Sequence, residues 1–158
     1  MYIMYNWEII YRIEMKLIIA VMLSVANIIL SEYSLFVNPL ILVIASVIII
    51  SEDKYSLLKI TLLSNLVYLI SDLGIKIVAG YQDSIGTAFI NFSSYAALIV
   101  IWITIIFNSI FSKRKVKIKQ KLFAIFAYPA LAVLHTALFY NFSNISHGII
   151  REISSLWN

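Results

Sequence analysis

Long, uninterrupted apolar segments constrain this chain more than any other feature of its sequence. The segments 56–80, 86–111 and 121–142 are long enough to cross a hydrocarbon core as helices, which takes about 20 residues. Two shorter apolar segments cover about 15–31 and 36–50. Apolar residues run continuously in all of them, whereas barrel strands alternate with period two. The sequence therefore predicts an all-α, polytopic membrane helical bundle with about five transmembrane helices.

The composition indicates that lipid is the main solvent of this bundle. Hydrophobic residues make up 62% of the 158 positions, charged residues make up 13%, and the mean hydropathy is +0.95. A soluble domain carries about a quarter charged residues, so this chain has too little polar surface to coat a water-soluble globule. A very apolar soluble helical domain is the alternative. No repeat or linker divides the chain, and we expect a single membrane domain over 1–158.

A basic cluster between the last two apolar segments predicts the orientation of the bundle. Its residues are Lys113, Arg114, Lys115, Lys117, Lys119 and Lys121. Basic loops remain on the cytoplasmic side, which places the amino terminus in the cytoplasm and the carboxyl terminus outside it. We expect a bacterial cytoplasmic (inner) membrane. The short segments 15–31 and 36–50 leave two alternatives, a partly re-entrant pair and four spans with one interfacial helix.

The same basic cluster is a candidate binding site for lipids or for a partner. Basic residues near a membrane surface attract anionic headgroups at about 1 kcal/mol each, and they also attract acidic protein segments. Setting the topology is the simplest of these roles. Because the basic residues border apolar segments, the net charge of +4 does not indicate a nucleic-acid partner.

Both ends of the chain are expected at the membrane surface. Residues 1–14 carry tyrosines and Trp7, and residues 143–158 place isoleucines and Trp157 on about one helical face. Amphipathic helices with such aromatic anchors lie at the level of the lipid headgroups. An ordinary frayed terminus is the alternative for each end.

A polar stripe interrupts the apolar segment 56–80. Its members recur at helical spacing and are Thr61, Asn65, Tyr68, Asp72 and Lys76. A charge inside a span costs about 2.5–3.5 kcal/mol at mid-helix, so it faces protein or water. Lys76 is four residues from Asp72 and can pair with it, or extend outward along its aliphatic stem. The stripe should therefore face the bundle interior or a subunit interface.

The segment 121–142 carries a matching pair, His135 and Tyr128. His135 lies at nearly the depth of Asp72, counted from the outer ends of the two segments. Pro129 frees a backbone carbonyl one turn earlier. We expect Asp72 and His135 to lie near each other, with the tyrosines beneath. Such a network either fixes helix packing or serves as an ion or proton relay or a small polar-ligand site.

No catalytic pattern stands out in the sequence. The motifs HExxH, GxSxG, CxxC and the Walker loop are absent, and there is no cysteine. An intramembrane aspartyl enzyme needs a second carboxylate at the depth of Asp72, and no other apolar segment carries one. We therefore expect a protein that is not an enzyme and that has no metal site and no cofactor.

Part of the chain resembles the bacterial rod shape-determining protein MreD. The resemblance rests on Asn38-Pro39 opening one segment and on Asp72 and Gly74 near the end of the next. It implies a membrane protein of similar size with five or six spans. Lys76 and the lack of a glycine-rich approach to Asp72 depart from that pattern.

These features together predict how the protein acts. The short loops leave no extramembrane domain, so partners must be other integral membrane proteins, further copies of the chain or membrane lipids. We expect a non-catalytic scaffold, accessory or immunity-type subunit. The alternative is a homo-oligomeric ion channel or small transporter that uses the stripe around Asp72.

Overall fold

The computed structural model describes residues 2–31, 37–78, 84–111, 116–139 and 155, with backbone alone at 2–14 and 84–87. These residues form five α-helices and no strand, which confirms the expected all-α bundle. The helices are α1 (Tyr2–Leu30), α2 (Asn38–Ile50), α3 (Leu57–Val78), α4 (Ser84–Phe111) and α5 (Ile118–Phe139). The tail expected at 143–158 lies outside the described residues, apart from Ser155.

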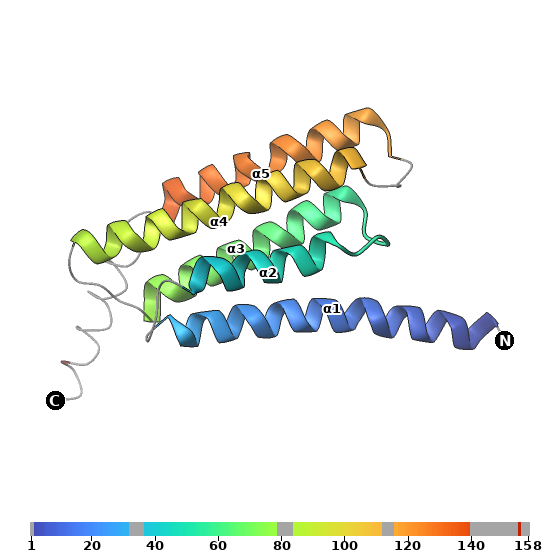
Figure 1. The fold of residues 1–158 in the computed structure, drawn as a ribbon, viewed down its shortest axis with the longest axis horizontal. Coiled ribbons are helices and arrows are strands. Elements are labelled where there is room, and N and C mark those ends of the chain that lie inside the picture. Colours follow the sequence, from blue (N-terminus) through green and yellow to red (C-terminus); the bar gives the residue numbers. More distant parts are fainter. Residues whose placement is uncertain (1, 32–36, 79–83, 112–115, 140–154, 156–158) are drawn as a thin grey trace.

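The helices lie side by side with alternating direction (Figure 1). α1 packs on α2 and α3, and these two helices pack in turn on α4 and α5. α1, α3 and α5 therefore run the same way. This arrangement gives three layers, in which α3 is the central helix because it contacts each of the other four.

Helix α1 is longer than the sequence analysis expected. The interfacial helix of about 1–14 and the span of about 15–31 are one continuous helix of 29 residues. No glycine or proline occurs in this stretch, so nothing in the backbone favours a break. In Figure 1 its amino-terminal part extends beyond the ends of the other helices.

Within the part of the chain that the structure describes, three helices are long and apolar enough to cross a membrane, as judged from length and composition. They are Leu57–Val78, Ala88–Phe111 and Ile118–Phe139, and two shorter apolar stretches cover Met15–Leu30 and Asn38–Ile50. The 13 residues of α2 reach about 20 Å at 1.5 Å per residue. That length is below the roughly 30 Å of a hydrocarbon core, so α2 is a short member of the bundle.

Local sequence explains where the helices begin and end. Pro39 stands in the first turn of α2, where its missing N–H removes no helical hydrogen bond. Ser56 caps α3, because its Oγ accepts the backbone N–H of Lys59 at 3.2 Å. At the end of α2, Asn108 of α4 donates its Nδ2–H to the Ile50 carbonyl at 3.2 Å. An ion pair of 3.1 Å between Lys16 and Glu52 joins α1 to the turn that follows α2.

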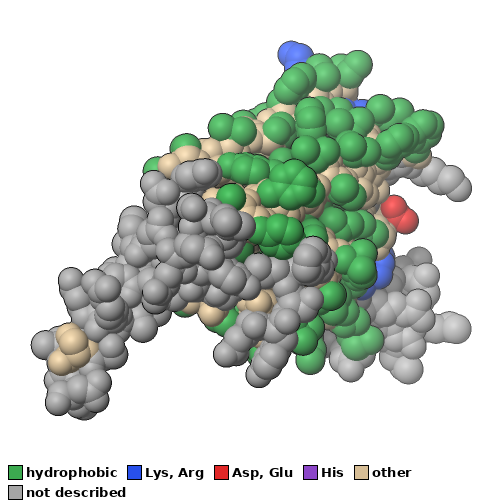
Figure 2. Space-filling model, turned by 60° about the vertical axis from the view of Figure 1, so that its left-hand side comes forward, with side chains coloured by type: hydrophobic (Ala, Val, Ile, Leu, Met, Phe, Trp, Pro, Cys, Tyr) green, Lys and Arg blue, Asp and Glu red, His purple; other side chains and the backbone are tan. Residues whose placement is uncertain are grey.

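The interior of the bundle combines large apolar side chains such as Ile49, Ile101 and Ile105 with small and polar ones, and many further large apolar side chains point outward. The fully buried residues include Ala20, Ala45, Ala97, Ala124 and Ala132. Gly74 brings α3 close to α1, because a β-carbon at this position would overlap the side chain of Ile28. In Figure 2 most of the described side chains on the visible face are hydrophobic, and the visible charged ones lie near its upper and right-hand edges. A surface of this kind matches hydrocarbon surroundings.

Candidate functional site

Asp72 is the centre of a buried polar cluster that joins three helices. Its side chain lies on α3 and is 1% exposed. Oδ2 accepts hydrogen bonds from Lys76 Nζ at 2.7 Å and from His135 Nε2 of α5 at 2.8 Å. Oδ1 accepts the hydroxyl of Ser94 from α4 at 2.6 Å. The two residues that we expected to lie near each other, Asp72 and His135, are therefore in direct contact.

The three donors compensate the cost of burying a carboxylate in the bundle. A buried charge loses the hydration of water and becomes favourable only with close partners and satisfied hydrogen bonds. The ammonium of Lys76 supplies the opposite charge, and the hydroxyl and imidazole donors occupy further lone pairs of Asp72. Hydrogen bonds to a charged group are about twice as strong as those between neutral groups.

Lys76 faces the interior of the protein and does not extend to the membrane surface. It is 2% exposed, and besides its ion pair with Asp72 its Nζ donates to the backbone carbonyl of Phe139 at 3.2 Å. Phe139 is the last residue of α5, where carbonyl groups lack helical partners and carry partial negative charge. Lys76 thus caps α5 while it neutralises Asp72.

The two ring nitrogens of His135 differ, because Nε2 bonds to Asp72 while Nδ1 has no such bond to a described residue. Because Nε2 faces a carboxylate oxygen, it must carry the hydrogen of that bond. Nδ1 is buried and has no hydrogen-bond partner among the described residues. The ring packs edge-on against Tyr68, with centroids 5.6 Å apart, and lies 5.1 Å from the ring of Phe139. Aromatic packing therefore fixes the orientation in which Nε2 meets Asp72.

The rest of the predicted stripe does not touch Asp72 by hydrogen bonds. Thr61 donates to the Leu57 carbonyl of its own helix at 2.9 Å. Asn65 reaches α5, where its Nδ2 lies 3.4 Å from the carbonyl oxygen of Tyr128. Tyr68 and Tyr128 belong to the same buried cluster, and the Tyr128 hydroxyl has no partner within the described residues. The stripe therefore contacts α5 at separate levels, through Asn65 at one and through the Asp72 cluster at another.

Pro129 produces a further contact between α4 and α5. A proline has no N–H, so it leaves the carbonyl four residues earlier without its helical partner. That carbonyl belongs to Ile125, and the indole Nε1–H of Trp102 on α4 donates to it at 2.8 Å. The freed group that the sequence predicted is thus used for helix packing.

Sequence reasoning missed two of these residues, Ser94 and Trp102. No spacing in the sequence distinguishes Ser94 from the neighbouring Ser93. The contact of Trp102 could have been predicted from the sequence. Pro129 frees a carbonyl inside an apolar segment, and an indole N–H in another such segment needs an acceptor.

The chemistry available at Asp72 is limited by its neighbours. Its oxygens already accept from an ammonium, an imidazole and a hydroxyl. Within the part of the chain that the structure describes, no group of three His, Cys, Asp or Glu residues is placed to hold a metal ion. Neither of the two surface pockets described below is lined by a residue of this cluster.

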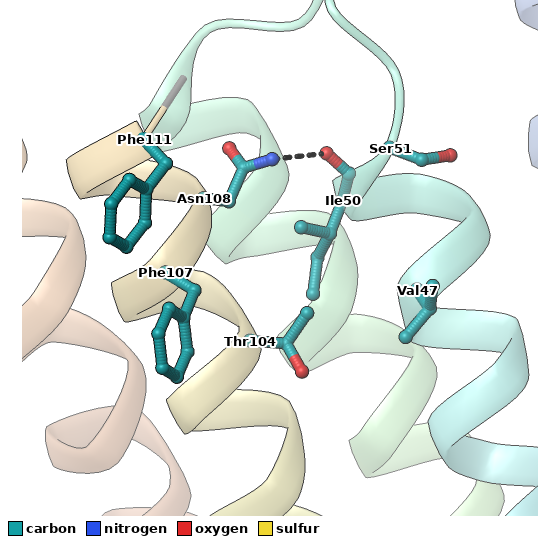
Figure 3. Close-up of a pocket in the computed structure, with 7 residues that line it drawn as sticks. All are labelled: Val47, Ile50, Ser51, Thr104, Phe107, Asn108 and Phe111. Atoms are coloured by element: carbon teal, nitrogen blue, oxygen red, sulfur yellow. Dashed lines mark hydrogen bonds between the residues drawn. The ribbon is translucent and has the colours of Figure 1, made fainter.

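The first pocket, which we call the α2–α4 groove, lies where α2 and α4 end (Figure 3). It has a volume of about 380 Å³ and is lined by Val47, Ile50, Ser51, Thr104, Phe107, Asn108 and Phe111. Its two hydroxyl groups donate to carbonyls of their own helices. Phe107 and Phe111 are stacked along one wall, with ring centroids 5.9 Å apart. The groove is therefore an apolar surface.

The second pocket, the α3–α5 pocket, lies where α3 and α5 begin. Its volume is about 320 Å³, and it is lined by Ser56, Leu57, Leu58, Val116, Lys119, Gln120 and Phe123. Lys119 is exposed, as is Lys117, while Lys121 is half-buried. The remaining basic residues that we singled out, 113–115, lie outside the described residues.

Comparison with known proteins adds no family to this description. No protein-family model, no curated protein and no solved structure matches the chain. The resemblance to MreD therefore rests on the residues named above alone.

Proposed function

We propose that this protein is a small, non-catalytic integral membrane subunit that binds other membrane proteins as a scaffold, accessory or immunity-type component. The supporting observation is that the Asp72 carboxylate takes part in contacts between helices. Its carboxylate is bonded by donors from three helices and is 1% exposed, so the charge inside the bundle holds helices together. In this proposal the amino terminus lies in the cytoplasm of a bacterium and the carboxyl terminus outside it.

The outer surface supports binding within the bilayer. The turn between α2 and α3, residues 51–56, is short, and large apolar side chains point outward from every helix. Membrane helices associate through close packing and interhelical hydrogen bonds. A partner helix would therefore meet this protein along an exposed apolar face.

One observation favours the alternative, a homo-oligomeric channel or small transporter. Several buried polar atoms have no hydrogen-bond partner among the described residues, including both side-chain polar atoms of Asn27 and the hydroxyls of Ser46, Ser64 and Ser71. Buried polar groups are ordinarily bonded to protein or to ordered water. Water among these side chains would give a polar interior that spans α1, α2 and α3.

Two measurements on the full chain distinguish these functions. The scaffold predicts that the protein purifies from its native membrane with a different membrane protein at fixed stoichiometry, and that proteoliposomes of the pure chain conduct no ions. The channel predicts a symmetric homo-oligomer with ion flux that disappears in Asp72→Asn. Flux from the pure chain, lost in that variant while the oligomer persists, would refute the scaffold.

A further inference from the structure

We propose that the α3–α5 pocket binds one anionic phospholipid. The phosphate group would be held by Lys119, and an acyl chain would lie along the exposed apolar face of α3. This site is separate from the Asp72 cluster and does not depend on the partner-binding function proposed above.

The lining of the pocket combines a cation with apolar walls. Lys119 is the charged lining residue, Gln120 and Ser56 are polar, and none of the described residues that line the pocket is acidic. Leu58 and Phe123 form apolar walls and are 48% and 58% exposed. A ligand that fits this lining has an anionic group joined to a hydrocarbon part, which is the chemistry of an anionic phospholipid.

Local backbone adds to the positive character of the pocket. It lies where two helices begin, because Ser56 directly precedes α3 and Ile118 is the first residue of α5. First-turn amide groups have no partner within their helix and carry partial positive charge. The two helix starts reinforce the ammonium of Lys119, which supplies the full charge.

The apolar path of the acyl chain continues from the pocket along α3. Leu58, Leu62 and Leu66 are spaced by four residues and are 48%, 50% and 50% exposed, so they form one stripe on the outer face of the helix. A hydrocarbon chain that enters at Leu58 can follow this stripe toward the centre of the membrane.

The α2–α4 groove serves as a comparison for the contribution of the Lys119 charge to lipid binding. It is of similar size, but the described residues that line it include no basic one, and its hydroxyl groups are bonded to carbonyls of nearby helical residues. Both sites can accept hydrocarbon, while among their described lining residues Lys119 of the α3–α5 pocket is the one cation that can meet a phosphate. The difference predicts headgroup selectivity at one site and none at the other.

Charge removal at matched positions tests the headgroup contact. The full-length protein in detergent is titrated with phosphatidylglycerol or phosphatidylcholine, and bound lipid is counted by native mass spectrometry. We expect one phosphatidylglycerol to bind more tightly than phosphatidylcholine. Lys119→Gln should weaken phosphatidylglycerol binding about fivefold, the effect of one basic residue near an anionic headgroup. Lys117→Gln removes the same charge from an exposed residue that does not line the pocket, and it should have a smaller effect.

A steric pair of variants tests the pocket without changing charge. Leu58→Trp fills the α3–α5 pocket and should abolish the tightly bound phosphatidylglycerol. Leu62→Trp places the same side chain one turn further along α3, outside the pocket lining, and should leave the tight headgroup contact in place. Far-ultraviolet circular dichroism of each variant confirms that the bundle is folded.

Three outcomes would overturn the proposal. Equal loss in Lys119→Gln and Lys117→Gln would show diffuse attraction to the basic cluster instead of a site. Equal affinity for the two lipids would show that the phosphate contact contributes no selectivity. Retention of the tight lipid in folded Leu58→Trp would show that it binds elsewhere.

Discussion

Trp102 of α4 donates its indole N–H to the carbonyl of Ile125, the group that Pro129 leaves without a helical partner. A side chain on one helix thereby completes the backbone hydrogen bonding of another. Two consequences can be measured, because the donor and the proline can be changed separately.

Trp102→Phe should destabilise the protein by about 1 kcal/mol beyond the loss of ring size, since it leaves a partly buried carbonyl unbonded. Pro129→Ala returns an N–H that can reach Ile125 within the helix. In the Pro129→Ala background, Trp102→Phe should therefore cost less. Unfolding in mixed dodecyl maltoside and sodium dodecyl sulfate, followed by circular dichroism, measures the coupling. Strictly additive effects would contradict the assigned role of the proline.

Removing the charge of Lys76 alone should be among the most damaging changes in the bundle. Lys76→Met leaves the Asp72 carboxylate buried without its cation, which costs about 3–5 kcal/mol in buried ion pairs. The double variant Asp72→Asn with Lys76→Met removes both charges and should be more stable than Lys76→Met alone. The same detergent unfolding assay compares the two. A double variant less stable than the single one would show that Asp72 does not depend on this charge.

Two adjacent serines on α4 provide a matched test of the Asp72 cluster. Ser94 donates to the carboxylate at 2.6 Å, whereas Ser93 donates to the Ile90 carbonyl of its own helix at 2.9 Å. Ser94→Ala should cost about 1.5–3 kcal/mol, the range for hydrogen bonds to charged groups. Ser93→Ala should cost clearly less in the same assay. Equal costs would mean that the bond to Asp72 does not strengthen the contact between α3 and α4.

The close approach of α1 and α3 depends on Gly74. A β-carbon at this position would overlap Ile28, so Gly74→Ala should destabilise the bundle by about 1–3 kcal/mol through overpacking. Ile28→Ala removes the overlapping atoms, and the double variant should be more stable than Gly74→Ala. A cysteine cross-link between α1 and α3 that forms equally well in wild type and in Gly74→Ala would contradict this explanation.

Depth counting from the sequence placed Asp72 and His135 at the same level, and the structure brings them into contact. Helical spacing likewise assigned Asp72 and Lys76 to one face. The sequence could not decide that Lys76 turns inward, because its second acceptor is the backbone carbonyl of Phe139. A backbone carbonyl at a helix end is present whatever the residue type, so the amino-acid sequence does not reveal it as an acceptor.

The fold class followed from apolar continuity, while the boundary expected near residue 14 was placed from composition. Aromatic and charged residues before Met15 suggested a separate surface helix, yet the backbone continues unbroken through that point. A helix that passes from a polar into an apolar environment changes in side-chain composition, but its backbone does not have to break there. The pairing of Lys16 with Glu52 on the following turn was equally hidden, since it depends on how α1 and α2 align.

The unbroken course of α1 has a mechanical consequence. A continuous α-helix behaves as a stiff rod, so the part that extends past the other helices in Figure 1 and the part packed against α3 must tilt together. The helix would pivot about its contacts with α2 and α3, including the contact between Ile28 and Gly74. Force applied near Tyr2 therefore reaches the far end of the same helix, which makes α1 a lever.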